Sequence, residues 1–246
     1  MKASSRCEVM ISSRKKKPVI FFLGLAGSGK DTQAEILANK YKFKIINSGS
    51  ILRLFIASFT KFKKDSYERY EAEELKKIMN SGGLVPTLTV ISRWLKPLLE
   101  IIKHQSRHRG IIFSGSPRKI SEAWLLHEFF MNWPDARNNF EIMPIEVAIS
   151  KKEVLKRVLS RRQCEKCKKV FLAEDLKTMK SCNFCGGRLI RRKDDTKTSV
   201  LARIREYKNY TLPVLEYLKK LRKLKRVNGE QSVEKVHEDI VKAAGL

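Results

Sequence analysis

A glycine-rich segment, Gly24-Leu25-Ala26-Gly27-Ser28-Gly29-Lys30, follows a short apolar run and precedes a helical pattern. Glycines in this context let backbone N–H groups turn inward around phosphate oxygens, and the following helix N-terminus adds partial positive charge. Lys30 would supply a full charge to the β- and γ-phosphates. An accidental glycine-rich turn is the competing interpretation, but a strand before the turn and a helix after it favour a phosphate loop. The segment predicts triphosphate contacts from Gly27, Ser28, Gly29, Lys30, Asp31 and Thr32.

Four of the five cysteines form two Cys-x-x-Cys pairs, Cys164 with Cys167 and Cys182 with Cys185. Four thiolates at this spacing are typical of a structural zinc site, and they leave no open position for catalysis at the metal. A redox role is the alternative. A disulfide framework is disfavoured in a chain of this size.

The chain carries 52 Lys and Arg against 26 Asp and Glu, a formal net charge of +26. Such an excess attracts polyanions, including nucleic acid and nucleotide phosphates. Because the basic residues are spread along most of the chain, a solvated basic surface is favoured over a nucleic-acid surface. No apolar run approaches the roughly 20 residues that span a membrane, so we expect no membrane partner.

The first 17 residues are basic, with Glu8 as their one acid, and Cys7 lies alone among them. They lack an apolar segment long enough for a secretory signal. We expect a disordered N-terminal tail on a cytoplasmic, monomeric protein. A transit peptide for an organelle is the alternative for such a basic, serine-containing start.

Apolar runs and helical periodicity alternate along residues 18–246. They predict strands at Val19–Leu23, Phe43–Ile46, Ile111–Phe113 and Ile142–Ile149, with Lys225–Val227 as a candidate fifth strand. They predict helices at Lys30–Lys40, Ile51–Phe59, Tyr67–Asn80, Thr89–Lys103, Glu122–Met131, Lys151–Arg162, Thr198–Tyr207, Leu212–Lys223 and Val233–Ala244. Pro97 predicts a kink or break in its helix. The alternation predicts an α/β fold with a parallel sheet covered on both faces.

The segment Gly24–Gln33 resembles the Gly-x-x-Gly-x-Gly-Lys-x-Thr-Gln motif of the adenylate kinase family of nucleoside monophosphate kinases. The resemblance continues in order through Ser48–Arg53, Gly82–Pro86, Gly115–Arg118, Arg157–Arg162 and Arg192–Asp195. It implies a five-stranded P-loop core made of residues 18–46, 86–159 and 196–246. It also implies an inserted lobe for the nucleoside monophosphate at 47–85 and a lid at 160–195, where some family members carry zinc.

The resemblance further implies reversible transfer of the γ-phosphoryl group of MgATP to AMP, giving two ADP. Such a reaction needs alignment and charge neutralisation rather than covalent help. The implied catalytic residues are Lys30, Arg118, Arg161, Arg192 and Arg203. Beyond the phosphate loop, the implied ATP contacts are Arg157, Arg161, Val170, Phe171 and Gln231. The implied acceptor contacts are Ser48, Arg53, Gly83, Leu84, Val85, Gly115, Ser116, Pro117, Arg118, Glu122, Arg192 and Arg203.

Two departures concern Mg²⁺, one from the family pattern and one from the general phosphate-loop pattern. Ser114 stands where the family has an Asp that orients water around the ion, and Asp31 follows Lys30 where phosphate loops commonly have Ser or Thr. We hypothesise that Asp31 partly compensates for Ser114.

A third departure concerns the acceptor base, because Glu122 stands where the family has a Gln that reads adenine. An ionised carboxylate only accepts hydrogen bonds, which suits guanine or uracil better than adenine. The alternatives are a GMP, UMP or CMP kinase, or an exposed Glu122 with AMP held by other contacts. A catalytically weak nucleotide-binding protein and a zinc-ribbon nucleic-acid binder are further alternatives, although the latter leaves the phosphate loop unexplained.

Overall fold

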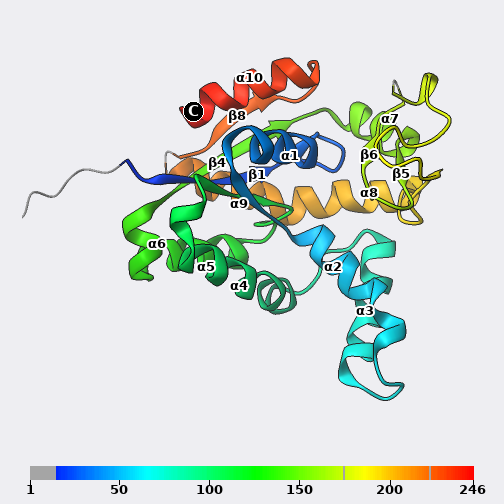
Figure 1. Ribbon diagram of the computed structural model, residues 1–246, viewed down its shortest axis with the longest axis horizontal. Helices are drawn as coiled ribbons and strands as arrows, with labels where there is room; N and C mark the ends of the chain where they lie inside the picture. Colours follow the sequence, from blue (N-terminus) through cyan, green and yellow to red (C-terminus); the bar gives the residue numbers. More distant parts are fainter. Residues whose placement is uncertain (1–14, 174, 222) are drawn as a thin grey trace, which may run out of the picture.

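A parallel sheet with strand order β2-β3-β1-β4-β8 forms the centre of the computed structural model, which describes residues 15–173, 175–221 and 223–246 (Figure 1). Its strands are β1 Lys17–Leu23, β2 Phe43–Asn47, β3 Gly110–Ser114, β4 Phe140–Ala148 and β8 Lys225–Asn228. The predicted five-stranded parallel sheet is therefore confirmed, including its candidate fifth strand. The tail expected at residues 1–17, with Cys7, lies mostly outside the described residues.

Helices cover both faces of the sheet. Residues Val19–Leu23 are at most 1 % exposed, and they alternate between two apolar clusters, with Phe21 facing one and Phe22 the other. A strand buried on both sides requires such a continuous apolar run. The Phe22 face packs on α1 Lys30–Tyr41 and α10 Val233–Ala244. The Phe21 face packs on α4 Thr87–Lys103, α5 Ile120–Asn132, α6 Pro134–Asn139 and α9 Leu212–Lys220.

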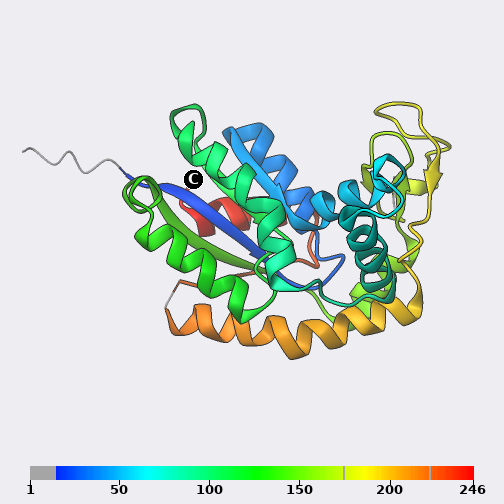
Figure 2. The same cartoon turned by 90° about the horizontal axis from the view of Figure 1, so that it is seen from below.

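Two smaller segments project from one end of this core, at the right of Figures 1 and 2. The first contains α2 Ser48–Ala57, a 3₁₀ turn Phe59–Lys61 and α3 Tyr67–Ser81. The second is an antiparallel sheet of β5 Arg162–Cys164, β6 Val170–Phe171 and β7 Leu189–Ile190, with a 3₁₀ turn Asp175–Lys177. The small sheet is joined to the core by α7 Lys151–Ser160 and α8 Lys197–Glu206.

Several local expectations differ from the structure. Helix α4 runs unbroken through Pro97, which lies on its exposed side, where water can satisfy the carbonyl freed by the missing N–H. Helix α6 was not predicted; it begins with Pro134 at its first position, where a missing N–H costs nothing. A π-helical turn, Tyr207–Thr211, joins α8 to α9, so the two predicted helices form one continuous run.

Helix α7 ends at Ser160, two residues before its predicted end, because Arg162 already pairs in the small sheet. A further 3₁₀ turn, Gln105–Arg107, precedes β3. Among the described helices, none combines the length and the apolar character that crossing a membrane would require.

Candidate functional site

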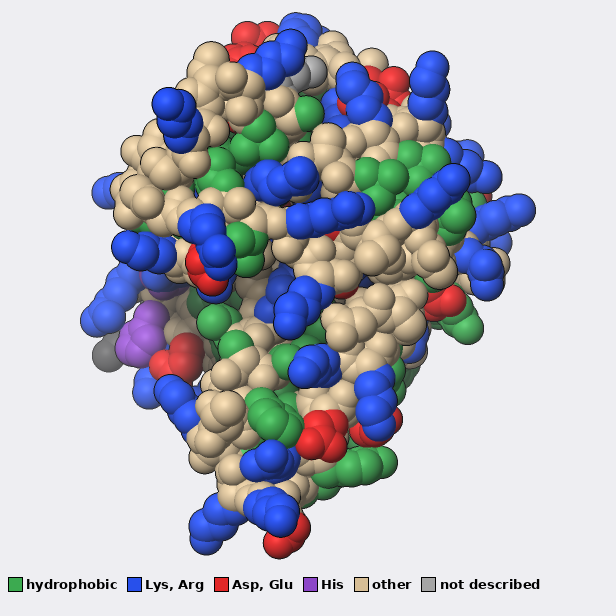
Figure 3. Space-filling view, turned by 90° about the vertical axis from the view of Figure 1, so that its right-hand side faces the viewer, with side chains coloured by type: hydrophobic (Ala, Val, Ile, Leu, Met, Phe, Trp, Pro, Cys, Tyr) green, Lys and Arg blue, Asp and Glu red, His purple; other side chains and the backbone are tan. Residues whose placement is uncertain are grey.

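A cleft lies at the carboxyl edge of the sheet, where the loops after β1, β2 and β3 meet the small sheet and α8. Parallel strands end at the same edge, so segments far apart in sequence converge there. On the face of the molecule that carries the two projecting segments, Lys and Arg are more frequent than Asp and Glu among the charged side chains (Figure 3). The site is therefore suited to an anionic ligand.

The phosphate loop is a tight turn in which two glycines lie too close to neighbouring elements to carry a side chain. Gly24 has a φ of 134°, and a side chain there would begin 2.3 Å from the carbonyl oxygen of Val147. Gly27 has a φ of 78°, and its Cβ would lie 2.9 Å from Cγ2 of Val158. The loop thus packs directly on β4 and α7, which explains both glycines.

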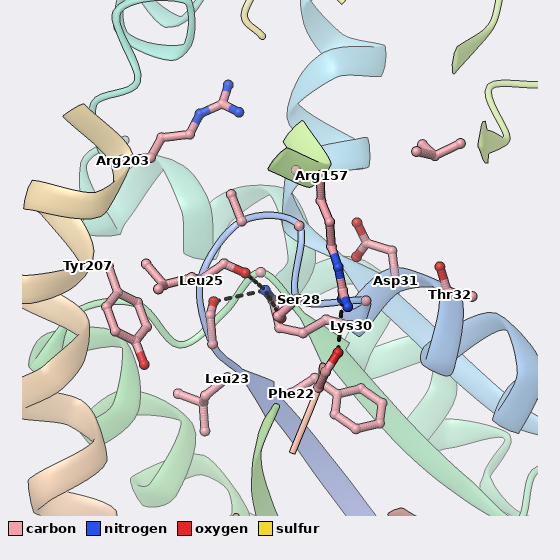
Figure 4. A pocket seen from close by; sticks show the side chains of 18 of the residues that line it. Phe22, Leu23, Leu25, Ser28, Lys30, Asp31, Thr32, Arg157, Arg203 and Tyr207 are labelled. Carbon is pink, nitrogen blue, oxygen red and sulfur yellow. Dashed lines mark hydrogen bonds between the residues drawn. The ribbon is translucent and has the colours of Figure 1, made fainter. Parts of the chain in front are cut away.

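The Lys30 ammonium lies inside this loop (Figure 4). It donates to the carbonyl oxygens of Gly24 at 2.8 Å and Leu25 at 2.7 Å, and to Oγ of Ser28 at 3.1 Å. Burial lowers the pKa of Lys30 to about 8; Asp31 opposes this shift, while nearby arginines add to it. A desolvated cation in a cradle of backbone groups is suited to bind phosphate oxygens.

Arginines from α2, α7, α8 and the small sheet converge around two aspartates. Arg161 makes a bidentate pair with Asp195, through Nε and Nη2 at 2.7 Å each. Arg203 contacts both aspartates, and Nη1 of Arg53 lies 3.8 Å from Oδ2 of Asp194. Guanidinium groups outnumber the carboxylates here, so the cluster can still neutralise phosphate charge.

Crowding among these cations is visible at Arg192. Its Nε donates to Oε1 of Gln163 at 3.0 Å. Burial lowers the pKa of Arg192 to about 10, and the positive charges of Arg53 and Arg161 contribute to the shift. An anion between these side chains would relieve that repulsion.

Arg118 and Arg157 also line the cleft. Burial lowers the pKa of Arg118, and its backbone carbonyl accepts a hydrogen bond from Oγ1 of Thr211 at 3.2 Å. Arg157 donates to Glu153 at 2.7 Å and to the carbonyl oxygen of Gly229 at 2.9 Å (Figure 4). The loop of Gly229 also contributes Gln231 to the wall of the cleft, as expected from the sequence.

Glu122 is 2 % exposed and lines the cleft, so the alternative that it is exposed on its helix is wrong. Its Oε2 accepts a hydrogen bond from the backbone N–H of Arg118 at 3.0 Å. Burial raises the pKa of Glu122, although that N–H and the Arg118 guanidinium oppose the shift. Nearby, the hydroxyls of Ser48 and Ser116 are hydrogen-bonded at 2.7 Å.

Most of the residues expected from the sequence do line this one cleft: Gly27, Ser28, Gly29, Lys30, Asp31, Thr32, Ser48, Arg53, Gly83, Leu84, Val85, Gly115, Pro117, Arg118, Glu122, Arg157, Arg161, Val170, Arg192, Arg203 and Gln231. Phe171 does not; strand alternation turns it into the small core around Cys164 and Cys182. Ser116 does not line the cleft either; it is buried, with 1 % of its surface exposed.

Several lining residues had no predicted role, among them Asn47, Asp194, Tyr207 and Thr211. Asp194 belongs to a quoted motif, so its pairing with arginines had a sequence signal. Tyr207 and Thr211 begin and end the π-helical turn, and no pattern in the sequence marks such a turn.

The four expected cysteines come together in the small sheet. Their sulfur atoms all lie within 4.8 Å of one another, with Cys164 and Cys182 buried and Cys167 and Cys185 exposed. The Sγ–Sγ distances from Cys164 to Cys185 and from Cys167 to Cys182 are 3.4 and 3.6 Å. Such spacing suits four thiolates about 2.3 Å from a shared zinc ion, so this donor set fits the metal.

Comparisons with known proteins agree with this geometry. The family model described as adenylate kinase matches residues 22–223. An adenylate kinase of Borreliella burgdorferi is 32% identical over 225 residues, which cover 91% of this chain and 96% of the relative. One of Chlamydia pneumoniae is 34% identical over 227 residues, covering 92% and 97%. One of Archaeoglobus fulgidus is 31% identical over 223 residues, covering 90% and 95%. Sequence motifs, fold and relatives thus agree that the chain belongs to the adenylate kinase family of nucleoside monophosphate kinases.

Proposed function

We propose that this protein transfers the γ-phosphoryl group of MgATP to AMP, reversibly, giving two ADP. The observation that carries the proposal is the convergence of Lys30 and of guanidinium groups from several elements on one cleft. Phosphoryl transfer depends on positioning and charge neutralisation, which this arrangement supplies. An oxygen of the AMP phosphate attacks the γ-phosphorus, and the bond to the bridging oxygen of the β-phosphate breaks.

Each cation has a proposed role that follows from its place. Lys30 in the phosphate loop would hold the β- and γ-phosphates. Arg53 and Arg118, near Ser48 and Glu122, would grip the acceptor phosphate. Arg161 and Arg203, which share the pair of aspartates, would surround the transferring group together with Arg192. Arg157, beside the Gly229 carbonyl, would cover the ATP base.

Residues 47–85 would act as the lobe for the monophosphate and 160–195 as the lid. The pair between Arg53 and Asp194 links these two segments. A phosphate bound to Arg53 would compete with Asp194 for the guanidinium, so acceptor binding and lobe movement are expected to be coupled. Closure would exclude water, which otherwise accepts the phosphoryl group.

The test is initial-rate kinetics with ATP and each of AMP, GMP, CMP and UMP. We expect the highest kcat/KM with AMP. A clear preference for another monophosphate would overturn the proposed acceptor while leaving a kinase. If ATP binds and none of the four monophosphates yields diphosphate, the protein is a nucleotide-binding family member without this activity.

A buried Glu122 can still recognise adenine if its carboxyl group is neutral. A protonated carboxyl offers one donor and one acceptor, as an amide does, and these match adenine N1 and its amino group. The groups that face Glu122 are the N–H and guanidinium of Arg118, Lys119 and the Ser116 hydroxyl. Burial outweighs them and raises the Glu122 pKa. We therefore propose that Glu122 reads the acceptor base in its neutral form.

Glu122→Gln is expected to remove a pH dependence of AMP binding. Raising the pH past the raised pKa of Glu122 ionises the carboxyl group, which then loses its donor, so KM for AMP should rise by roughly tenfold across that titration. The Gln variant should keep a low KM across the same pH range. Because the AMP phosphate titrates identically with both enzymes, the variant is its own control. Parallel pH profiles for the two enzymes would contradict the proposal.

The lowered pKa of Lys30 predicts weaker capture of ATP in alkaline solution. The free enzyme carries the ammonium charge below pH 8 and loses it as the pH rises past its pKa of about 8. At saturating AMP, kcat/KM for ATP should therefore decrease above that pH, with a slope that approaches a tenfold loss per pH unit. Bound phosphates stabilise the ammonium, so kcat should begin to fall only at higher pH. A flat kcat/KM up to pH 9.5 would refute this assignment.

A further inference from the structure

Asp31 is a carboxylate at the mouth of a phosphate loop. It is the second residue of α1, directly after Lys30, and it lines the cleft (Figure 4). Its Oδ1 accepts hydrogen bonds from Oγ of Ser114 at 2.6 Å and from Nδ2 of Asn47 at 2.7 Å. The two donors lie at the ends of β3 and β2, so Asp31 is held by the sheet as well as by its own helix.

The geometry leaves the second carboxylate oxygen for a ligand. The amide of Asn47 has a fixed orientation, because its Oδ1 accepts from the backbone N–H of Ser50 at 2.9 Å. Ser114 is fully buried and cannot turn toward solvent. Both donors therefore meet Oδ1, and Oδ2 receives no hydrogen bond from the described residues.

Asp31 is charged at neutral pH. Burial pushes its pKa upward, but the Ser114 hydrogen bond and the charges of Lys30 and Arg53 push it down further, so the pKa lies below its usual value. An ionised carboxylate beside bound triphosphate would repel it unless a cation lay between them. Mg²⁺ meets that need, since it keeps several waters and is held by few carboxylates together with substrate phosphates.

We infer that Oδ2 of Asp31 accepts hydrogen bonds from the waters of the Mg²⁺ that ATP carries, with Ser114 and Asn47 holding the carboxylate in place. The inference rests on the proposed function, which makes MgATP the substrate. In the family pattern an aspartate would stand at the end of β3, in the place of Ser114. Here the carboxylate comes from α1 instead, and the β3 position supplies the hydroxyl that orients it. Asp31 is thus a positioning residue for the metal's hydration shell.

The test measures the affinity for ATP by isothermal titration calorimetry, once with excess Mg²⁺ and once with EDTA. No acceptor nucleotide is present. We expect Mg²⁺ to strengthen ATP binding to the unaltered protein by about tenfold or more. In EDTA, ATP should bind Asp31→Asn more tightly than it binds the unaltered protein. The Mg²⁺ advantage, meaning the ratio of the ATP affinity in Mg²⁺ to that in EDTA, should shrink to about twofold in this variant. Glu35→Gln removes an exposed carboxylate from the same helix, outside the cleft, and should retain the full Mg²⁺ advantage.

A second experiment moves the carboxylate from position 31 to position 114. Asp31→Asn combined with Ser114→Asp should regain at least half of the lost Mg²⁺ advantage, on a logarithmic scale. If Asp31→Asn does not fold by circular dichroism, Ser114→Ala must instead lower the advantage several-fold, because it removes one of the two donors. If Asp31→Asn folds and leaves the Mg²⁺ advantage unchanged, the inference is overturned. If Asp31→Asn does not fold, an unchanged Mg²⁺ advantage in Ser114→Ala overturns it. Absence of ATP binding to the unaltered protein would overturn the proposed function instead.

Discussion

Lys30→Met is expected to lower kcat at saturating ATP and AMP by about 10³-fold. Lys30 is a desolvated cation whose three donors point into the phosphate loop. The charge on the transferring group is neutralised mainly by such fixed cations, and removing one preorganised group of this kind costs about 10² to 10³ in rate, or more for a full charge. Methionine keeps the length and loses the charge.

The matched control is Lys40→Met, an exposed lysine in the last turn of the same helix, which should leave kcat within about twofold. Rates should be measured under single-turnover conditions, so that product release cannot mask the chemical step. Thermal unfolding of both variants shows whether the loop remains folded. A kcat for Lys30→Met within tenfold of the unaltered enzyme would refute the assigned role.

The core could be predicted because its signals are local. The run Val19–Leu23 is apolar on both faces and ends at a glycine turn, so strand, loop and helix follow from adjacent residues. The same holds for Val233–Ala244, whose apolar periodicity gave both helix ends correctly. The errors lie where a local rule competes with packing. Pro97 is tolerated because it lies on the exposed side of its helix, which depends on how α4 sits on the sheet.

The candidate site was predictable to the extent that motifs specify it. Phosphate-loop residues and arginines line one cleft because each motif follows a strand or flanks the small sheet. Glu122 shows the limit of such reasoning. Its burial depends on the Arg118 loop, whose carbonyl is bonded by Thr211 from a turn more than ninety residues away. A functional link between Asp31 and Ser114 was hypothesised because both residue types are unexpected at their positions, but their hydrogen bond was not predicted.

We propose that the four thiolates hold a structural zinc ion, and we expect its removal to unfold the lid and lower activity strongly. The lid core consists of Cys164, Phe171 and Cys182 with a few partly buried apolar side chains. A cluster of this size cannot offset the conformational entropy of ordering the segment, so the metal must supply the difference. The lid also holds Arg192 and Asp195, and the latter pairs with Arg161 and Arg203. Metal loss should therefore disorganise the cation cluster, and kcat should fall by about 100-fold or more.

Cys185→Ser tests this expectation alongside Cys7→Ser, which changes the cysteine that lies outside the four-thiol group. Metal analysis should find about one zinc per chain in the unaltered protein and in Cys7→Ser, and much less in Cys185→Ser. Hydrogen exchange should accelerate in β5, β6 and β7 of Cys185→Ser, while amides of β1 and β3 stay protected, since the main sheet has its own core. ATP should still bind the phosphate loop, with reduced affinity. Full activity without bound zinc would refute a structural role for the metal, because the lid core would then suffice to hold the cation cluster by itself.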